Sequence, residues 1–594
     1  MIKNILLEKL KSSLDQLGFD SNLLQISHPA NESFGDYSTN IALQMAKIEK
    51  KSPMVLAKLI ADKISPDEYI EKVEIMKPGF INFWITKNKL TSICKDIDSE
   101  FGRSETSFGK TFIVEYSSPN IAKPFTIGHL RSTIIGDSIA NILEATGAKV
   151  YRDNHLGDWG TQFGKLIYAI KTWGNEDEIK NSDNPVKILV ELYVKFHTEA
   201  EKNPVLEDEG RKWFKKLESG DKEARGLWEK SVEWSWTEFD KLYKKLGIRT
   251  EKFENDGRGY GESYFEDKME SVIAELKKNK ILTESKGAWL VFYPNDKFPP
   301  LMLVKQDGAT LYATRDLATD KFRLKKYGDN ITIINEVGAE QSLYFQQLYE
   351  VETMANWLKK EQRIHIKHGM YRFKEGKMST RKGNTIWLED VLKEAERRAF
   401  SLSKHDSKFE GPEVISQSNK YSDAAKKNIM GFAQRSNISE VISIGALKWN
   451  DLKRSSHLDI VFDWEDVLNM HGNSGPYVQY TYVRCKSLMR KITKKTSGNF
   501  SQTTKINDEE LALLRSLLKF PQIIIESAEN YAPNYICTYL YDLAQKYNFF
   551  YQKHQILKEE NENIKNLRLL ITASVAHVLK HGLGLLGIET VEKM

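Results

Sequence analysis

The sequence predicts three parts: a small α+β domain, an α/β domain on a parallel sheet with a helical insertion, and an all-α helical bundle. Three observations lead to this prediction. A strand, a loop, a helix and a second strand follow one another between residues 111 and 153, which is one unit of a parallel α/β sheet. A stretch rich in Glu, Lys and Trp from about 172 to 290 favours helices, and the pattern is almost wholly helical after about Asp390.

Length and composition narrow the class of protein. At roughly 150 residues per domain, 594 residues suggest about four units. No stretch reaches the roughly 18 uncharged apolar residues of a membrane helix, and charges interrupt the N-terminal segment where a secretion signal would need an apolar core. Cys94, Cys485 and Cys537 are far apart and lack metal-ligand spacing. We therefore expect a cytoplasmic protein with no membrane association and no protein-bound metal.

The first domain is expected over residues 1–105. Leucines at helical spacing predict an amphipathic N-terminal helix, and they are Leu6, Leu10, Leu14 and Leu17. Residues 73–76 and 80–85 read as two strands joined by the turn Lys77-Pro78-Gly79. A polar stretch at 103–107 then predicts a linker.

The second domain is expected over residues 106–390. A buried-type strand at 111–116 leads through a loop to a helix over 128–146, with Gly147 where a C-terminal cap belongs, and a second strand follows at 149–153. After the insertion at about 172–290, residues 301–304 and 331–337 are expected to resume the sheet, with a helix over 314–327 between them. Residues 391–594 form the predicted helical domain.

Residues 118–129 form the first segment whose residue types could bind a ligand or take part in catalysis. A strand end feeds a helix whose N-terminus offers unpaired backbone N–H groups and the positive end of a dipole, which binds phosphate. Gly128 lets a nucleotide lie against the backbone, and His129 can donate a hydrogen bond to an oxygen that gains charge. By itself the segment could also be an ordinary turn with a capping histidine.

The second segment is the basic loop, residues 376–383, in which glycines flank two hydroxyls and a run of basic residues. Such a loop can fold over a polyphosphate, or it can be a basic surface turn. A third feature is the basic stripe at 481–500, which has no acid. It is either one solvated helix face or a phosphate-facing surface. Its cations are Arg484, Lys486, Arg490, Lys491, Lys494 and Lys495.

Taken together, the first two segments resemble the HIGH and KMSKS signatures of class I aminoacyl-tRNA synthetases, in the right order and about 250 residues apart. Longer strings, among them GHLRSTIIGD and LGDWGTQFG, resemble arginyl-tRNA synthetases specifically. The resemblance spans nearly the whole chain, and the matching ranges are 34–37, 78–83, 115–124, 128–137, 156–164, 311–316, 475–480 and 585–589. It implies a Rossmann-type class I catalytic domain, an N-terminal domain that contacts tRNA and a C-terminal anticodon-binding domain.

The same resemblance implies an arginine–tRNA ligase. Such an enzyme activates L-arginine with ATP to arginyl-adenylate and transfers the arginine to the 3′ end of tRNA(Arg). Mg²⁺ should accompany the ATP as a second cofactor, and a monomer is expected. Six aromatics beside the basic stripe could stack on RNA bases or fill the helical core. They are Tyr477, Tyr480, Tyr482, Tyr531, Tyr547 and Phe550.

The resemblance also assigns roles to individual residues. A planar guanidinium with five donors calls for carboxylate, amide and phenol partners, and the implied arginine-binding set is Glu115, Asn120, Tyr312, Asp316 and Gln341. If Thr314 begins the helix, Asp316 falls in its first turn. The implied ATP-binding residues are Lys123, Gly128, His129, Lys377 and Met378. The implied catalytic residues are Lys123, Thr126, His129, Lys377, Ser379, Arg381 and Lys382. The implied tRNA-binding residues are Phe80, Asn82, Tyr477, Gln479 and Arg484.

Two positions depart from the family pattern. Thr126 stands where the first signature has a histidine, and Thr380 stands where the second has a lysine. Lys123, just before the first signature, could supply the missing charge to the ATP phosphates, with Arg381 and Lys382 as alternatives. Two other readings remain open: an RNA-binding, catalytically weak paralogue of these synthetases, and a small-molecule adenylyltransferase. The long helical C-terminal domain counts against the second of these.

Overall fold

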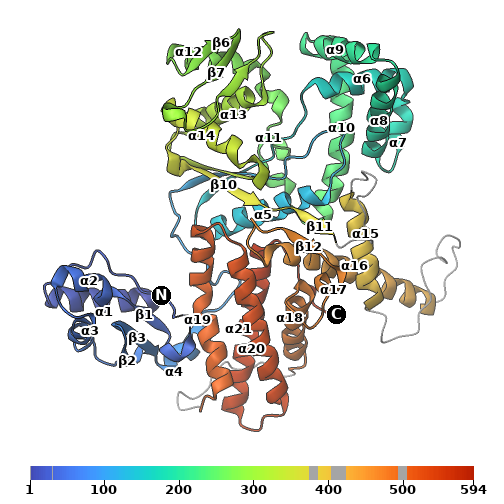
Figure 1. The fold of residues 1–594 in the computed structure, drawn as a ribbon. Coiled ribbons are helices and arrows are strands. Elements are labelled where there is room, and N and C mark those ends of the chain that lie inside the picture. The colour runs from blue at the N-terminus through green and yellow to red at the C-terminus, as the bar shows by residue number, and fades with distance from the viewer. Residues whose placement is uncertain (1, 30, 374–385, 403–422, 493–504, 594) are drawn as a thin grey trace.

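The computed structural model describes residues 2–29, 31–373, 386–402, 423–492 and 505–593. Figure 1 shows an α/β sheet at the centre, two units above it, a helical bundle below it and a small N-terminal domain beside the bundle. Across the described residues, we find no helix long and apolar enough to cross a membrane.

The N-terminal domain has the predicted hairpin. Its β2 and β3 pair antiparallel with Met76 opposite Phe80, and β1 completes the sheet in the order β1-β3-β2. The leucines at positions 6, 10 and 14 are fully buried in the domain core, as their spacing predicts. The elements are α1 (Ile2–Gln16), β1 (Tyr37–Thr39), α2 (Ile41–Glu49), α3 (Pro53–Ala61), β2 (Ile70–Met76), β3 (Phe80–Ile85) and α4 (Lys87–Asp96).

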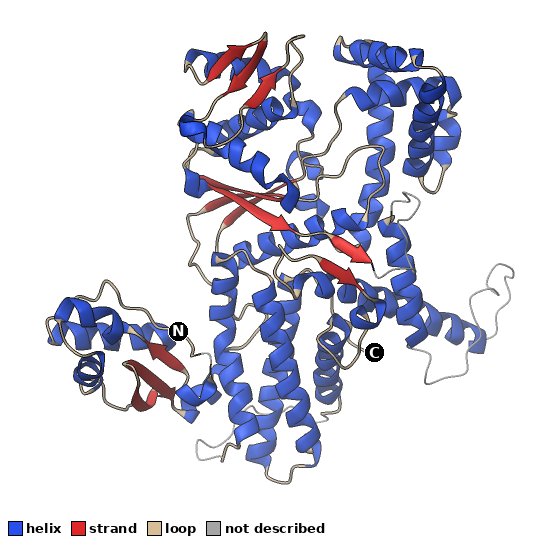
Figure 2. Ribbon diagram, in the orientation of Figure 1, coloured by secondary structure: helices blue, strands red, loops and turns tan. Residues whose placement is uncertain are grey.

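The central sheet is parallel throughout, with strand order β10-β9-β4-β5. Figure 2 shows these strands crossing the middle of the molecule. Because the strands run the same way, their carboxyl ends meet at one edge, where ligands bind in open α/β sheets. The strands are β4 (Thr111–Glu115), β5 (Lys149–Asp153), β9 (Ile331–Gly338) and β10 (Arg363–His368). The predicted strands of the first α/β unit are thus confirmed.

Helix α5 (Ile127–Ala145) connects β4 to β5 and is buried on nearly every side. It packs on the sheet above and on helices of the C-terminal bundle below, which explains why its sequence has so few charges. Gly147 follows the helix with φ +85°, so the predicted glycine cap is confirmed.

The insertion divides into two parts. Helices α6 to α10 form an all-helical unit at the upper right of Figure 1. Their bounds are α6 (Thr161–Trp173), α7 (Glu176–Asn181), α8 (Pro185–Lys202), α9 (Val205–Glu218) and α10 (Lys222–Lys245). The second part begins with α11 (Glu254–Gly257) and the 3₁₀ helix Glu262–Lys268, and it continues as α12 (Met269–Lys278) and a three-stranded sheet.

One strand prediction is wrong in its partner. Residues 301–304 do form a strand, β8 (Leu301–Val304), but it pairs antiparallel with β7 (Ala288–Val291), which pairs with β6 (Leu282–Ser285). It therefore does not resume the parallel sheet. A short apolar run predicts a buried strand, whereas its pairing depends on contacts distant in sequence.

Where the structure describes it, the C-terminal region is helical, as predicted, apart from one short strand. Strand β12 (Ile460–Phe462) pairs parallel with β11 (Tyr371–Phe373), so residues on both sides of the predicted boundary at 390 share one structure. The boundaries at 105 and 390 stay predictions. The helices are α15 (Leu388–Leu402), α16 (Asp423–Leu452), α17 (Trp464–Val467), α18 (Gly475–Arg490), α19 (Asp508–Glu529), α20 (Asn534–Lys553) and α21 (Glu562–Leu585).

A buried arginine connects α5 to this region. Arg131 is fully buried and its Nε lies 3.2 Å from a carboxylate oxygen of Asp451. Its other nitrogens donate to the carbonyls of Gly369, Ser456 and Leu458. A single guanidinium thus links α5 to α16 and to the segments around β11 and β12.

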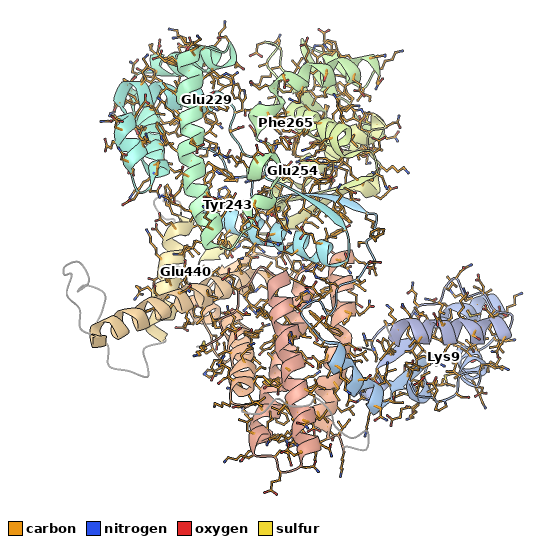
Figure 3. The ribbon with its side chains drawn as sticks, turned by 180° about the vertical axis from the view of Figure 1, so that it is seen from behind. Lys9, Glu229, Tyr243, Glu254, Phe265 and Glu440 are labelled. Atoms are coloured by element: carbon orange, nitrogen blue, oxygen red, sulfur yellow. The ribbon has the colours of Figure 1, made fainter. Side chains whose placement is uncertain are left out.

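The N-terminal domain attaches to the bundle through ion pairs. Arg515 of α19 lies 2.8 Å from Asp36, while Lys519 and Lys546 lie 2.9 and 2.7 Å from Glu32. Figure 3, which views the molecule from behind, shows this domain at the outer side of the bundle, with Lys9 labelled on it.

Candidate active site

The candidate site lies at the carboxyl edge of the parallel sheet. It combines the end of β4, the loops after β4 and β5, the start of α5 and the first turns of α13 (Tyr312–Tyr327). The backbone of the loop after β4 is strained. Three residues other than glycine have a positive φ there: Ser117 (73°), Ser118 (43°) and Ala122 (55°). Such strain clusters where a site needs a fixed geometry.

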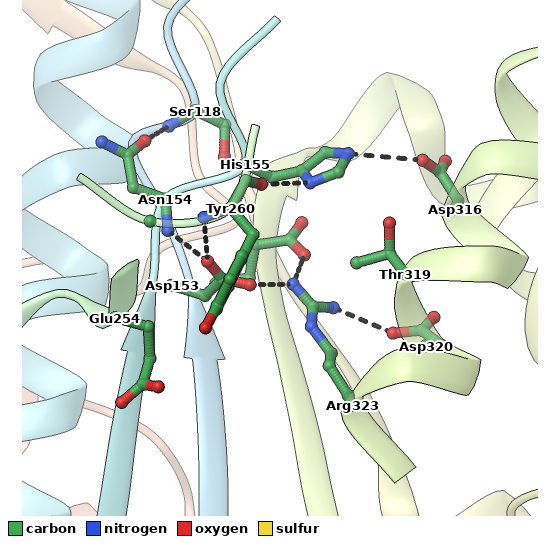
Figure 4. Close-up of polar contacts among 12 residues, drawn as sticks. Ser118, Asp153, Asn154, His155, Glu254, Tyr260, Asp316, Thr319, Asp320 and Arg323 are labelled. Carbon is green, nitrogen blue, oxygen red and sulfur yellow. Dashed lines mark hydrogen bonds and ion pairs between the residues drawn. The ribbon is translucent and has the colours of Figure 1, made fainter. Parts of the chain in front are cut away.

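Glu115, at the end of β4, is buried and belongs to a charged cluster. Arg323 of α13 pairs with Glu115, lies 2.6 Å from Asp153 and lies 2.9 Å from Asp320 (Figure 4). The pKa of Arg323 is raised, since these three carboxylates outweigh the effect of burial. An internal guanidinium therefore already occupies one oxygen of Glu115 and fixes the position of this carboxylate.

Tyr312 and Asp316 lie on one face of α13, one turn apart. The helix begins at Tyr312 and not at Thr314, so Asp316 lies past the first turn and the prediction for the helix start is wrong by two residues. Tyr344 of α14 (Ser342–Met354) packs edge-on against Tyr312, with ring centroids 4.9 Å apart, and its hydroxyl donates to Asp316. Burial and the charge of Asp316 raise the pKa of Tyr344.

His155 is the histidine of the loop after β5 and it faces Asp316 across the site (Figure 4). Its Nδ1 lies 3.1 Å from the carbonyl of Tyr260, and its Nε2 lies 3.7 Å from a carboxylate oxygen of Asp316. Burial alone would lower the pKa of His155, yet the facing carboxylate of Asp316 and the charges of Glu115 and Glu262 outweigh it and raise the pKa to about 10. The facing carboxylates therefore favour the imidazolium form of His155.

Asn120 lies beside the backbone of Gly157. A side chain at position 157 would come within 2.4 Å of the Asn120 amide oxygen, so glycine is required for Asn120 to sit there. Gln341 is exposed at the end of the 3₁₀ helix Ala339–Gln341, directly before α14. Four of the five predicted arginine-binding residues thus surround the carboxyl edge, while Gln341 is at its margin.

Thr126 and His129 form a unit at the start of α5. The backbone N–H of Thr126 donates to Nδ1 of His129 at 3.0 Å, and the Thr126 hydroxyl is also 3.0 Å from this nitrogen. Burial and the charges of His368 and Lys123 lower the pKa of His129 to about 4. Because Nδ1 accepts a hydrogen bond, the neutral ring carries its proton on Nε2 and presents it as a donor.

Lys123 is exposed before α5, and Gly128 is exposed in its first turn. The predicted residues of the basic loop, Lys377, Met378, Ser379, Arg381 and Lys382, lie outside the described residues. The chain after the loop does return to the first signature. Trp387 bridges to Thr126, and the Leu388 N–H donates to the Phe125 carbonyl at 2.9 Å.

Two of the predicted tRNA-binding residues have buried side chains. Asn82 is 2% exposed and accepts a hydrogen bond from Ser38 at 2.6 Å, so it holds the small sheet together. Gln479 is fully buried and donates to the carbonyl of Glu589 at 2.8 Å. Phe80 is exposed on the N-terminal domain.

Arg484, in contrast to Asn82 and Gln479, lies next to exposed aromatic side chains. The Arg484 guanidinium lies 4.9 Å from the ring centre of Tyr480 and 5.0 Å from that of Tyr551, both exposed, and donates to Asn548 at 2.5 Å. Tyr477 is half-buried against Tyr541. Of the other predicted aromatics, Tyr482, Tyr547 and Phe550 fill the helical core.

Sequence reasoning missed His155, Tyr344 and Arg323. A signal existed for His155 alone, because it follows a predicted parallel strand by two residues and therefore falls at the binding edge. Tyr344 and Arg323 sit inside helices, where spacing alone does not distinguish a site residue from a core residue.

A parallel sheet with strand-edge carboxylates, a glycine–histidine pair opening the next helix and an appended helical bundle define a class I aminoacyl-tRNA synthetase. Comparison with family models agrees. Residues 97–464 match the model for tRNA synthetases class I (R), catalytic domain, residues 478–594 match the DALR anticodon binding domain, and residues 2–85 match the arginyl tRNA synthetase N terminal domain.

Relatives and solved structures point the same way. The chain is 39% identical to an arginine–tRNA ligase of Clostridium perfringens, with both chains covered entirely, and 38% identical to that of Fusobacterium nucleatum over 96% of this chain and 95% of the relative. Arginyl-tRNA synthetase from Plasmodium falciparum superposes with a TM-score of 0.77 at 26% identity, covering 100% of this chain and 99% of the other. The arginyl-tRNA synthetase structure from Thermus thermophilus shares the fold, with a TM-score of 0.79 at 22% identity and full coverage of both chains. The chain belongs to the arginyl-tRNA synthetase family.

Proposed function

We propose that this protein charges tRNA(Arg) with L-arginine. In the first step the arginine carboxylate attacks the α-phosphorus of ATP, and pyrophosphate leaves. In the second step a terminal ribose hydroxyl of the tRNA attacks the acyl carbon, and AMP leaves. The observation that carries this proposal is the position of Glu115 at the end of β4 together with that of Tyr312 and Asp316 in the first turns of α13.

The arginine side chain would bind against Asp316. This carboxylate is only partly buried, with 25% of its side chain exposed, and Tyr312 beside it is 57% exposed, so a ligand can reach both. The hydroxyl of Tyr344 donates to one carboxylate oxygen of Asp316 and so orients this side chain. A guanidinium pairs with such a carboxylate through charge-assisted hydrogen bonds. Glu115, Asn120 and Gln341 would complete the pocket around the α-amino group and the rest of the ligand.

ATP would bind at the start of α5. Unpaired backbone N–H groups there attract phosphate, Gly128 leaves the backbone accessible, and His129 offers its Nε2 proton. Lys123 and the predicted residues of the basic loop would add positive charge. Catalysis would consist of positioning and charge stabilisation.

Mg²⁺ would accompany the nucleotide. Among the described residues, no three or more ligating side chains gather into a cage for a metal ion. Mg²⁺ usually keeps several waters and binds to substrate phosphates with few protein ligands. A nucleotide site with this donor set fits a magnesium–ATP complex, whose metal would neutralise charge on the phosphates.

The C-terminal helices would read the tRNA. Arg484, Tyr480 and Tyr551 join a cation to two exposed aromatic faces, which is the chemistry that stacks and neutralises single-stranded RNA. Phe80 of the N-terminal domain would add a weaker contact. We also expect a monomer that acts in the cytoplasm.

One alternative function is a synthetase paralogue that binds RNA without catalysis, a reading prompted by Thr126. The contact between Thr126 and His129 favours an active enzyme, because the threonine supports a histidine that retains a free donor. The other alternative, a small-molecule adenylyltransferase, gives no reason for the anticodon-binding domain matched at 478–594.

Arginine-dependent exchange of pyrophosphate into ATP, measured with and without tRNA(Arg), tests the proposal. We expect exchange with arginine and tRNA present, and arginylated tRNA as the product. Binding of tRNA with no exchange under any condition would favour the paralogue. Exchange with another amino acid but not with arginine would overturn the assigned substrate.

A further inference from the structure

The arginine pocket contains a cation before any arginine arrives. A backbone carbonyl only accepts hydrogen bonds, so the Tyr260 carbonyl 3.1 Å from Nδ1 of His155 fixes a proton on that nitrogen. The second nitrogen, Nε2, points toward Asp316 and makes no hydrogen bond within the part of the chain that the structure describes. Its distance of 3.7 Å from Asp316 allows an ion pair but is too long for a hydrogen bond.

The surroundings of His155 favour its charged form. Glu115 faces it from β4, Glu262 from the 3₁₀ helix after α11, Asp316 from α13, and Asp158 from its own loop. The cations in this neighbourhood are already paired, because Arg315 lies 3.2 Å from Glu262 and Arg323 bonds Glu115, Asp153 and Asp320. Among the residues that the structure describes, His155 is therefore the positive charge that faces Asp316 in the free pocket.

Arginine would compete with His155 for one carboxylate oxygen of Asp316. Tyr344 donates to Oδ2 of Asp316, which leaves Oδ1 for a guanidinium, and Oδ1 is the oxygen that faces His155. A guanidinium nitrogen bonded to Oδ1 at about 2.8 Å would lie against Nε2. Two protonated donors cannot share this space without strong repulsion. A neutral ring, in contrast, keeps its Nδ1 proton on Tyr260 and turns the Nε2 lone pair toward the guanidinium.

We propose that His155 is a resident counter-ion of Asp316 that gives up its Nε2 proton to solvent when arginine binds. One positive charge enters the pocket and one proton leaves, so the net charge of the pocket is unchanged. The N–H bond at Nε2 breaks, its electron pair stays on the ring, and the ring becomes a hydrogen-bond acceptor for the arginine guanidinium. This inference rests on the proposed function, since it assumes that arginine binds at Asp316.

Calorimetric titration of the full-length protein with L-arginine tests the exchange. Titrations at one pH in phosphate and in Tris, whose ionisation enthalpies differ, give the number of protons released per arginine bound. We expect about one proton between pH 6.0 and 7.5. Release of one proton raises the affinity about tenfold per pH unit, or about thirtyfold over this range. The α-ammonium group of arginine stays protonated over this range and contributes little.

Two variants identify the source of the proton. His155→Gln keeps a polar side chain but cannot titrate, so proton release should fall to nearly zero and the affinity should become nearly independent of pH. Glu262→Gln is the matched control, because burial raises the pKa of Glu262 and makes it the competing source. This variant should still release about one proton. Circular dichroism and thermal unfolding would verify that both variants are folded.

The outcomes distinguish a failure of the proton exchange from a failure of the proposed function. Arginine binding without proton release, or equal release from His155→Gln, would overturn the exchange and leave the proposed function intact. Loss of release in Glu262→Gln alone would assign the proton to the carboxyl group and also overturn the exchange. If the folded parent protein binds no arginine at any pH, with or without tRNA, the assignment of arginine as the substrate fails.

Discussion

We expect arginine recognition to depend most directly on Asp316. Asp316→Ala removes a charged hydrogen-bond partner, a loss of about 1.5–3 kcal/mol. The KM for arginine should therefore rise roughly ten- to a hundredfold, while the KM for ATP stays nearly constant. Asp329→Ala removes an exposed carboxylate just beyond the far end of the same helix and should change neither value. An unchanged arginine KM in Asp316→Ala would show that the pocket lies elsewhere.

The Thr126 hydroxyl contacts His129, and we expect this contact to matter more than any direct contact of Thr126 with a phosphate. Thr126→Val keeps the side-chain shape but removes the hydroxyl that lies 3.0 Å from Nδ1. The backbone N–H of residue 126 still holds the ring, so the loss should be about 1 kcal/mol, or roughly fivefold in kcat. Single-turnover adenylate formation would measure it. Thr126→Ser should match the parent, and equal rates in the Val variant would remove any role for the hydroxyl.

Lys123 is the residue that we expect to supply the charge missing at Thr380. An electrostatic contact made mainly in the transition state is worth about 10²–10³-fold in rate. Lys123→Ala should accordingly lower kcat by that factor with little change in the KM for arginine. Adding Thr380→Lys to this variant should recover part of the loss. Full activity in Lys123→Ala would instead assign the charge to Arg381 or Lys382.

At this scale the family resemblance selected Glu115 and Asp316, and the helix-start motif selected His129. The structure brings Glu115 and Asp316 to the carboxyl edge of the sheet and places His129 in the first turn of α5, while their roles toward ligands stay predictions. Asn82 and Gln479 belong to equally recognisable motifs, yet their side chains are buried and hydrogen-bonded within the protein. A motif indicates that the identity of a residue is important. Only the fold shows whether its side chain is free to contact a ligand or is hydrogen-bonded within the protein.

Among the elements, α5 connects two parts of the molecule, since it contacts both the sheet and the bundle. Arg131→Met would leave the Asp451 carboxylate without its buried partner, which typically costs about 3–5 kcal/mol. The midpoint of thermal unfolding should fall clearly. Arg372→Gln breaks the exposed pair between Arg372 and Asp459 and should change the midpoint little. Equal midpoints at one scan rate would show that Arg131 does not hold the two regions together.

Element pairing marks the limit of prediction from sequence. The strands at 111–116 and 149–153 could be paired correctly because a single helix connects them and parallel crossovers follow simple rules. No such rule covered Leu301–Val304, whose partner β7 precedes it in a hairpin with a register irregularity. The local pattern of an apolar strand is the same in both sheets.

For the whole molecule, the bundle must both support α5 and meet the tRNA. Deleting the bundle would expose the buried face of α5, so a truncation cannot separate these two roles. Arg484→Gln is a finer test because glutamine can still bond Asn548. We expect weaker tRNA binding and a salt dependence whose slope falls by about one, with the KM values for arginine and ATP unchanged. The matched control is Lys212→Gln on α9, far from the bundle in Figure 1. Identical effects of the two variants would contradict an RNA contact at Arg484.

The ion pairs between the N-terminal domain and the bundle have a consequence for how the chain is made. Asp36 and Arg515 are 479 positions apart, so at ribosomal speeds of about 5–20 residues per second the domain waits roughly 25–100 s for its partner helix. During this interval one oxygen of Asp36 is already satisfied by the Ile85 N–H at 2.7 Å, within the newly folded domain. The other oxygen, together with Glu32, faces water until α19 and α20 emerge. Carboxylates tolerate that delay, whereas a large apolar patch in the same place would invite aggregation of the nascent chain.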